Sequence, residues 1–221
     1  MPLPTPYNSQ SSAIASYNYT DLAENTGVKL FYGAKTASSG AASYILSPNQ
    51  IYSKSISIGF GGGVLTNPTQ VTDIDFDLTA FNAPQSIRGT VLFNYFQKYH
   101  ADSGTCSGAT LIKLRKWDGT TETEIGEAWS DPSTIIDATH GYNFACIPLT
   151  IQKTPFKKGE NLRVTVQQWA QSPAAAAETT MGIDPMNRDA GTGDGNINPS
   201  TDTNPTSTTQ FKIWIPFDLD L

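Results

Sequence analysis

The stretch Phe211-Lys212-Ile213-Trp214-Ile215-Pro216-Phe217-Asp218-Leu219-Asp220-Leu221 decides the fold that the sequence predicts. Its odd-numbered residues are all large and apolar, whereas lysine and aspartate stand among the even-numbered ones. A period of two residues is typical of a β-strand, which turns successive side chains to opposite faces. Burying each apolar side chain stabilises the fold by about 1.5–3 kcal/mol. We therefore expect a core strand, with Pro216 at an edge position or a bulge because it has no N–H to donate.

A second alternating segment, residues 71–81, places apolar side chains opposite Asp73, Asp75 and Asp77. Three aspartates in a row on one face suggest a cation site. However, a flat row on a strand diverges, whereas hard cations need oxygen ligands that converge. A solvated outer face, which also protects the sheet from aggregation, is the favoured interpretation.

The rest of the chain predicts eight to ten short strands separated by turn signals, such as Asp118-Gly119 between two strand-like runs. This pattern predicts an all-β fold, an antiparallel β-sandwich of the jelly-roll kind. We divide the chain into an extended N-terminal arm at residues 1–27 and a single domain at residues 28–221. The domain carries a long loop at about residues 170–206, in which Ala174 to Ala177 is the one plausible helical turn.

The composition excludes several classes of protein. The net charge is -6 and 15% of the residues are charged, so a basic nucleic-acid-binding face is not expected. No apolar run has the length of a membrane span, and the N-terminus lacks the features of a secretory signal. We therefore predict synthesis in a cytoplasm, with no nucleic-acid or membrane partner. Two cysteines, Cys106 and Cys146, make no disulfide framework, although a single bridge stays open.

Candidate chemistry is sparse in this sequence. Only His100 and His140 could act as an imidazole base, and neither lies in a nucleophile motif. Each histidine precedes a cysteine by six positions, and two histidines with two cysteines could bind zinc. However, zinc ligands usually pair at shorter spacings. Acidic and amide side chains at residues 182–198 suggest a calcium-binding loop, but they do not match the EF-hand pattern. The sequence therefore predicts no enzymatic activity, no catalytic residues, no cofactor and no required metal.

Two segments indicate a surface for partners. The strand predicted at residues 87–99 is apolar on both faces, so an isolated sandwich would expose one of them. The arm carries tyrosines but no core pattern, and tyrosines are rigid anchors in interfaces. The candidate capsid or subunit contacts are Tyr7, Tyr17, Tyr19, Phe93, Tyr95 and Phe96.

Four segments together resemble the jelly-roll structural proteins of tailed bacteriophages, above all the decoration or cement proteins of the capsid exterior. They are the hairpin at residues 117–125, the strand entry at 156–164, the Asp184-Pro185-Met186-Asn187-Arg188 loop and the closing Ile215-Pro216-Phe217 strand. The resemblance implies a homotrimer that sits on the major capsid protein of the virion and stiffens the lattice without catalysis.

Two other classes stay open at this point. One is a carbohydrate-binding jelly-roll module of a viral fibre or adhesin, with Trp117, Trp129, Trp169 and Trp214 stacking on sugars. The other is an enzyme acting on polysaccharides, which needs two convergent carboxylates or a bound metal in a cleft. The fold alone does not choose among these classes.

Overall fold

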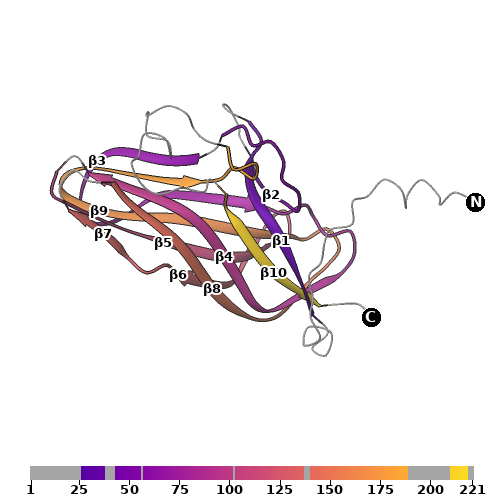
Figure 1. Ribbon diagram of the computed structural model, residues 1–221. Helices are drawn as coiled ribbons and strands as arrows, with labels where there is room; N and C mark the ends of the chain where they lie inside the picture. The colour runs from indigo at the N-terminus through magenta and orange to yellow at the C-terminus, as the bar shows by residue number, and fades with distance from the viewer. Residues whose placement is uncertain are drawn as a thin grey trace, which may run out of the picture.

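The computed structural model describes residues 26–37, 43–55, 57–101, 103–136, 140–188 and 210–218. These residues form ten β-strands (Figure 1). The strands are β1 (Thr26–Lys35), β2 (Tyr44–Ser47), β3 (Ser57–Asp77), β4 (Gln85–Ala101), β5 (Thr105–Trp117), β6 (Glu122–Trp129), β7 (Ser133–Ile136), β8 (His140–Phe156), β9 (Asn161–Gly182) and β10 (Lys212–Asp218). In the described ranges no helix has the length and apolar character needed to cross a membrane.

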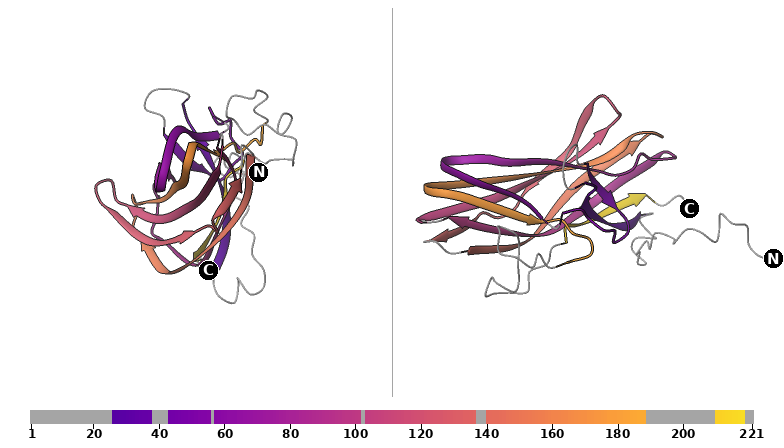
Figure 2. Two further views of the ribbon diagram at one scale, coloured as in Figure 1. Left: turned by 90° about the vertical axis from the view of Figure 1, so that its left-hand side faces the viewer. Right: turned by 90° about the horizontal axis from the view of Figure 1, so that it is seen from above.

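The strands join in one sheet in the order β6-β5-β9-β3-β2-β1-β10-β4-β8, and β7 pairs with β5. All described pairings are antiparallel except that of β2 with β3. The last residues of β4 also pair with the last residues of β9, so β9, β3, β2, β1, β10 and β4 close a ring of six strands. Figure 2 shows in its left-hand view how the strands surround a common interior. The predicted all-β, largely antiparallel fold is confirmed.

One hydrophobic core fills the interior. Side chains from both halves of the sheet meet there, since successive residues of each strand face opposite ways. The fully buried members include Phe76, Phe93, Ile112, Val164 and Ile213. The β10 strand lies between β1 and β4, and its odd-numbered residues Phe211, Ile213, Ile215 and Phe217 are all buried. The prediction of a core strand at this place in the sequence is confirmed.

Pro216 sits at a local irregularity shared by β10 and β4. The register between these strands shifts between Trp214 and Phe217, and the register between β4 and β8 shifts between Ile87 and Gly89. Gly89 has a φ of 103°, which side chains rarely adopt, and an added Cβ there would stand 3.5 Å from the Pro216 ring. The glycine and the proline therefore make one bulge, as the missing N–H of the proline predicts.

The segment expected to be a loop from residue 170 is a strand as far as Gly182. Here the prediction is wrong, including the helical turn at Ala174 to Ala177. The glycine-rich part of β3 pairs with this alanine-rich part of β9, with Gly63 opposite Ala177 and Val64 opposite Ala176. Small residues on both strands carry little intrinsic strand signal, and the pairing partner decides their conformation. Residues 189–209 lie outside the described residues, as do residues 1–25 of the arm.

Candidate functional site

The outward face of β3, β9, β5 and β6 is a network of ion pairs, called here the charged face. Arg163 on β9 donates from Nε to Asp77 Oδ1 at 2.6 Å and from Nη2 to Asp77 Oδ2 at 2.9 Å. Its guanidinium also contacts Asp75 and Glu122 and lies 4.7 Å from the centre of the Trp117 ring. Hydrogen bonds to Asp77 raise the pKa of the Arg163 guanidinium above its ordinary value. Charge-assisted bonds therefore tie these four strands together on their outer side.

The remaining partners extend this network to the β5–β6 hairpin. Lys113 Nζ lies 2.8 Å from Glu127 Oε2 and 3.2 Å from Glu124 Oε2. The hydrogen bond to Glu127 is the main reason why the pKa of Lys113 is raised. Asp75 accepts a hydrogen bond from the Thr165 hydroxyl at 2.5 Å. The aspartate row faces outward and pairs with side chains on β9. In the described part of the chain no group of three His, Cys, Asp or Glu side chains could hold a metal.

The outward face of β1, β10, β4 and β8 has the opposite character and is called here the apolar face. One cross-strand row runs through Leu30, Trp214, Leu92 and Pro148, which are direct neighbours in register. Their side chains are half-buried, except that Pro148 is exposed. The row is therefore a partly exposed apolar strip on an otherwise more polar surface.

The same face continues toward the far end of β4 and β8. Phe144 is 58% exposed and packs edge-on against Phe96, with ring centroids 4.9 Å apart. Cys146 is exposed next to Phe144 on this face and stands opposite Asn94. At the other end of the face, the Asp218 carboxylate of β10 is paired with Arg88 and Lys153. The apolar row between these ends crosses four adjacent strands.

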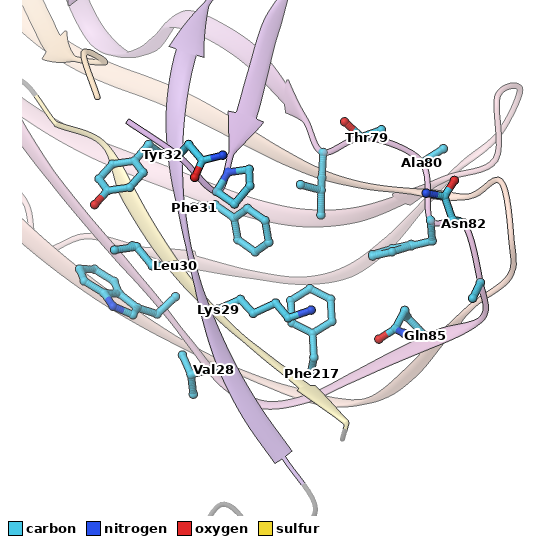
Figure 3. A pocket seen from close by; sticks show the side chains of 16 residues that line it. Val28, Lys29, Leu30, Phe31, Tyr32, Thr79, Ala80, Asn82, Gln85 and Phe217 are labelled. Atoms are coloured by element: carbon cyan, nitrogen blue, oxygen red, sulfur yellow. The ribbon is translucent and has the colours of Figure 1, made fainter. Parts of the chain in front are cut away.

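An open pocket lies where β1 leaves the sheet. β1 pairs with β10 along residues 26–32 and with β2 only at residues 32–35, so residues 27–31 have a strand neighbour on one side only within the described ranges. The pocket has a volume of about 760 Å³. Figure 3 shows Val28, Leu30 and Tyr32 on one side of β1, with Lys29, Phe31 and Phe217 on the other. A pocket of this size with apolar walls and few polar groups is typical of binding sites.

This pocket was not predicted from the sequence. Its walls come from β1, the end of β10 and the connection between β3 and β4, and include Leu78, Phe81, Asn82 and Gln85. Residues 28–32 read as an ordinary short strand, and alternation alone does not tell whether a strand has one neighbour or two. The signal that was available is Lys29, a charged residue whose parity matches that of the buried Phe31.

The candidate contact residues are distributed differently from the prediction. Phe93 and Tyr95 lie in the interior, with exposed fractions of 0% and 1%, and Phe96 is equally buried beside Phe144. Side chains buried in this way cannot touch a partner while the fold is intact. These three assignments are therefore corrected, and Leu92, which directly precedes Phe93 and has the opposite parity to Phe93 and Tyr95, is a half-buried residue on the outward side. Tyr7, Tyr17 and Tyr19 lie outside the described residues.

The cysteines and histidines do not converge. Cys106 is buried inside the sheet, whereas Cys146 is on the outward apolar face, and both are free thiols. Burial raises the pKa of the Cys106 thiol. His100 stands opposite His140 in the β4–β8 register, away from Cys106. The two cysteines of the suggested zinc site therefore lie on different sides of the sheet.

Asp184, which the sequence offered as a calcium ligand, has other partners. The carboxylate is fully buried and accepts hydrogen bonds from the Arg188 Nε at 2.9 Å and the Arg188 backbone N–H at 2.7 Å. The Arg188 guanidinium stacks 3.8 Å from the centre of the Tyr52 ring and also donates to the Ser53 carbonyl. This cluster fastens the chain after β9 to the segment before β3, and the Asp184 oxygens are already used in it.

The four tryptophans make no common platform for a sugar. Trp129 and Trp169 meet edge-on at 61°, with ring centroids 5.7 Å apart, and Trp117 is covered by Arg163. Trp214 belongs to the opposite, apolar face. A platform of several rings needs exposed, coplanar faces; Trp129 is 49% exposed, but the Trp169 ring beside it is tilted by 61°.

Comparisons with known proteins bear on the fold. No protein-family model matches the chain, and no curated protein matches it. A CocE/NonD family hydrolase from Staphylococcus aureus is similar in structure, with a TM-score of 0.50 and 13% identity, over 88% of this chain and 37% of the hydrolase. An alpha-amino acid ester hydrolase has a TM-score of 0.49 and 10% identity, over 86% of this chain and 36% of that protein. The chain therefore spans little more than a third of these hydrolases.

This finding corrects the prediction that the protein is not an enzyme. The prediction depended on an all-β fold without a catalytic motif, and the same fold occurs within a hydrolase. At 13% identity the likeness shows the fold alone. A structure of the Gx strain of infectious bursal disease virus also matches, over 87% of this chain and 36% of the viral protein, with 7% identity. Its TM-score is 0.31, and we draw no conclusion from it.

Proposed function

We propose that the protein is a structural component of a bacteriophage virion that decorates and stabilises the outside of the capsid as an oligomer, with a trimer as the expected state. The apolar face supports this proposal. Leu30, Trp214, Leu92 and Pro148 form a cross-strand row that water does not favour, on other strands than those that carry the Arg163 network. Such a division suits a protein with one side against a partner and the other side in solvent.

The proposal includes the arrangement of the strands and the partners. β6-β5-β9-β3 and β1-β10-β4-β8 form the two layers of a jelly-roll-like sandwich, with the shared core between them. The partners are other copies of this chain and the major capsid protein, and the protein is made in the host cytoplasm before it joins the virion. The N-terminal arm and neighbouring loops bind the capsid in this proposal.

The test is binding to undecorated capsids. We expect the double substitution Leu92→Ser with Pro148→Ser to lower capsid occupancy about tenfold or more, because it places hydroxyls in the centre of the apolar row. Glu124→Ser on the charged face is the matched control and should bind as wild type does. Circular dichroism of both variants verifies the fold. Equal occupancy for the two variants contradicts the proposal, and a wild-type protein that sediments as a monomer at micromolar concentration contradicts the oligomer.

A second candidate function is supported by the likeness to the CocE/NonD family hydrolase, of which the chain matches 37%. In that case the protein acts as the β-domain of a hydrolase assembled from more than this chain. Hydrolysis of simple esters by the purified protein, alone and with host or phage lysate fractions, distinguishes the two candidates. Activity that copurifies with this chain supports the second.

A further inference from the structure

The pocket beside β1 lies in line with β2. In the sheet, β2 stands between β3 and β1, but it has four residues and reaches β1 only at residues 32–35. The far wall of the pocket is made by residues 78–83, which follow directly after β3. Figure 3 shows β1 on one side of this gap and Thr79, Ala80 and Asn82 on the other. The pocket therefore occupies the place that a longer β2 would fill.

Backbone groups of β1 point into this gap. Gly33 donates its N–H to the Phe211 carbonyl at 3.1 Å. In an antiparallel ladder the backbone groups of alternate residues point to the same neighbour, so the odd-numbered residues of β1 face β10. The N–H and C=O groups of Val28 and Leu30 consequently point into the gap, and within the described ranges no strand pairs with them there. A strand added about 4.8 Å from β1 would bond to these groups.

The far wall of the gap is held in place by the start of β9. Leu78 donates its N–H to the Leu162 carbonyl at 2.9 Å, and Phe81 donates to the Glu160 carbonyl at 3.0 Å. Because β9 and β2 lie on opposite sides of β3, these bonds are directed away from the gap. Both walls therefore belong to the folded sheet, and an added segment would enter a site that already has its shape.

One position along the gap suits a large aromatic side chain. Gly27 stands opposite Phe217 in the β1–β10 register and has no side chain of its own to cover that ring. The Phe217 ring also meets the Phe81 ring edge-on, with centroids 6.2 Å apart. An aromatic ring opposite Gly27 on an added strand can contact both, in the tilted arrangements that aromatic pairs prefer.

The next position on the same face suits an acidic side chain. Lys29 has the parity of Gly27, and its ammonium lies 5.0 Å from the centre of the Phe217 ring. Among the described residues no salt bridge involves Lys29. A carboxylate directly opposite on an added strand would form a favourable cross-strand pair with it.

We propose that this gap binds an extended segment of a partner protein, antiparallel to β1 and opposite residues 27–30. The segment carries an acidic residue opposite Lys29 and, two positions later, a large aromatic residue opposite Gly27. It stops short of Tyr32, where β2 already pairs with β1. Backbone bonds to Val28 and Leu30 supply affinity, and the two inward side chains supply selectivity.

Charge favours a different protein over a second copy joined through the same edge. The β1 sequence TGVKLFYGAK contains no acidic residue, so the β1 edge of a copy offers Lys29 no carboxylate. The inference goes beyond the proposed function and does not depend on it, because a segment can add to this edge whatever the apolar face contacts.

Amide hydrogen exchange of the full-length protein tests whether the edge is available. We expect the amides of Val28 and Leu30 to exchange at least tenfold faster than those of Lys29 and Phe31, which face β10. Saturation with the blocked peptide acetyl-Thr-Thr-Glu-Thr-Phe-Thr-amide should slow the first two about tenfold or more. Protection of Val28 and Leu30 in the dilute free protein overturns the proposal, since the chain itself then fills the gap. Protection that grows with protein concentration also overturns it and assigns the gap to a second copy.

An exchange of charge between protein and peptide tests the chemistry of the site. Lys29→Glu should weaken binding of this peptide tenfold or more in calorimetric titration, and a peptide with lysine in place of glutamate should restore binding to that variant. Lys54→Glu, at an exposed position outside the pocket, is the matched control and should bind as wild type does. Serine in place of the peptide's phenylalanine should lower the affinity by a similar factor. Equal affinity of the wild type for the glutamate and lysine peptides, or no binding of either at millimolar concentration, overturns the proposal.

Discussion

On the charged face nearly every long polar side chain has a partner on a neighbouring strand, whereas on the apolar face the cross-strand neighbours are leucine, tryptophan and proline. Arg163 illustrates the first, with contacts to Asp77, Asp75 and Glu122. Leu92 illustrates the second, between Trp214 and Pro148. Both faces belong to strands that share one core. The difference shows how side-chain parity divides the middle of β4, where Phe93 and Tyr95 are buried in the core and Leu92 is half-buried on the outward side.

Neighbouring positions on β4 offer the strongest way to break this separation. Phe93→Ala removes a fully buried ring and should lower the free energy of unfolding by about 3–5 kcal/mol. Leu92→Ala, one residue earlier on the apolar face, should lower it by about 1 kcal/mol or less. Urea unfolding followed by fluorescence measures both. Similar losses for the two variants would show that the apolar face is as tightly packed as the core.

High pH should destabilise the interior through its buried tyrosines. Burial raises the pKa of Tyr95 to about 12 from the ordinary 10.0, and it raises the pKa of Tyr99 as well. A raised pKa means that the folded state keeps its proton longer than the unfolded state does. The stability is therefore complete below pH 10 and falls as the pH rises toward 12, by roughly 3 kcal/mol for a two-unit shift. Absorbance at 295 nm during unfolding at several alkaline pH values checks this, and tyrosines that all titrate near pH 10 in the folded protein contradict it.

Within the charged face, Arg163 should contribute more to the free energy of unfolding than Arg115 does. Arg163→Met removes the partner of three carboxylates and should cost about 1–2 kcal/mol of unfolding free energy. Arg115→Met is the control, since Arg115 bonds to Glu122 on the neighbouring β6 at 2.8 Å. It should cost about 0.5 kcal/mol, as exposed ion pairs do. Equal losses would mean that the network around Arg163 adds nothing to a single pair.

Added salt should act differently on the two faces, and its effect should be the smallest of those predicted here. Screening shortens the range of charge interactions to about 3 Å at 1 M salt, so the monomer should lose a few degrees of melting temperature through the charged face. Association through the apolar face should hold or strengthen under the same conditions, because excluded salts favour burial of apolar surface. Calorimetry in sodium chloride, which mainly screens charge, measures the melting temperature, and sedimentation in sodium sulfate measures association. Dissociation by salt would contradict an apolar interface.

The sequence predicted these features unequally, and for physical reasons. The alternation at residues 211–221 was enough to place β10 in the core, whereas the partner surface expected from the two-sided apolar character of residues 87–99 stays a prediction. Parity alone could not say which set of residues faces inward, so Phe93 and Tyr95 were assigned to the wrong side. The strand at Ala174 to Ala177 and the open edge of β1 depend on which strand lies beside them, and neighbours far apart in sequence leave no local pattern.

The pairing of β4 with the end of β9 governs how the chain reaches its native state. Residues 97–101 meet residues 177–181 across roughly eighty positions of chain, and this contact closes the ring. Chains dominated by such distant contacts fold slowly, in about milliseconds to seconds. Closing each long loop costs chain entropy before the contact forms and stabilises the fold. β9 is shared by β5, β3 and β4, so a nascent chain that ends before residue 182 lacks the strand that joins the two halves. Folding during synthesis therefore waits for β9 to leave the ribosome, and until then the half-formed sheet has open edges that invite aggregation.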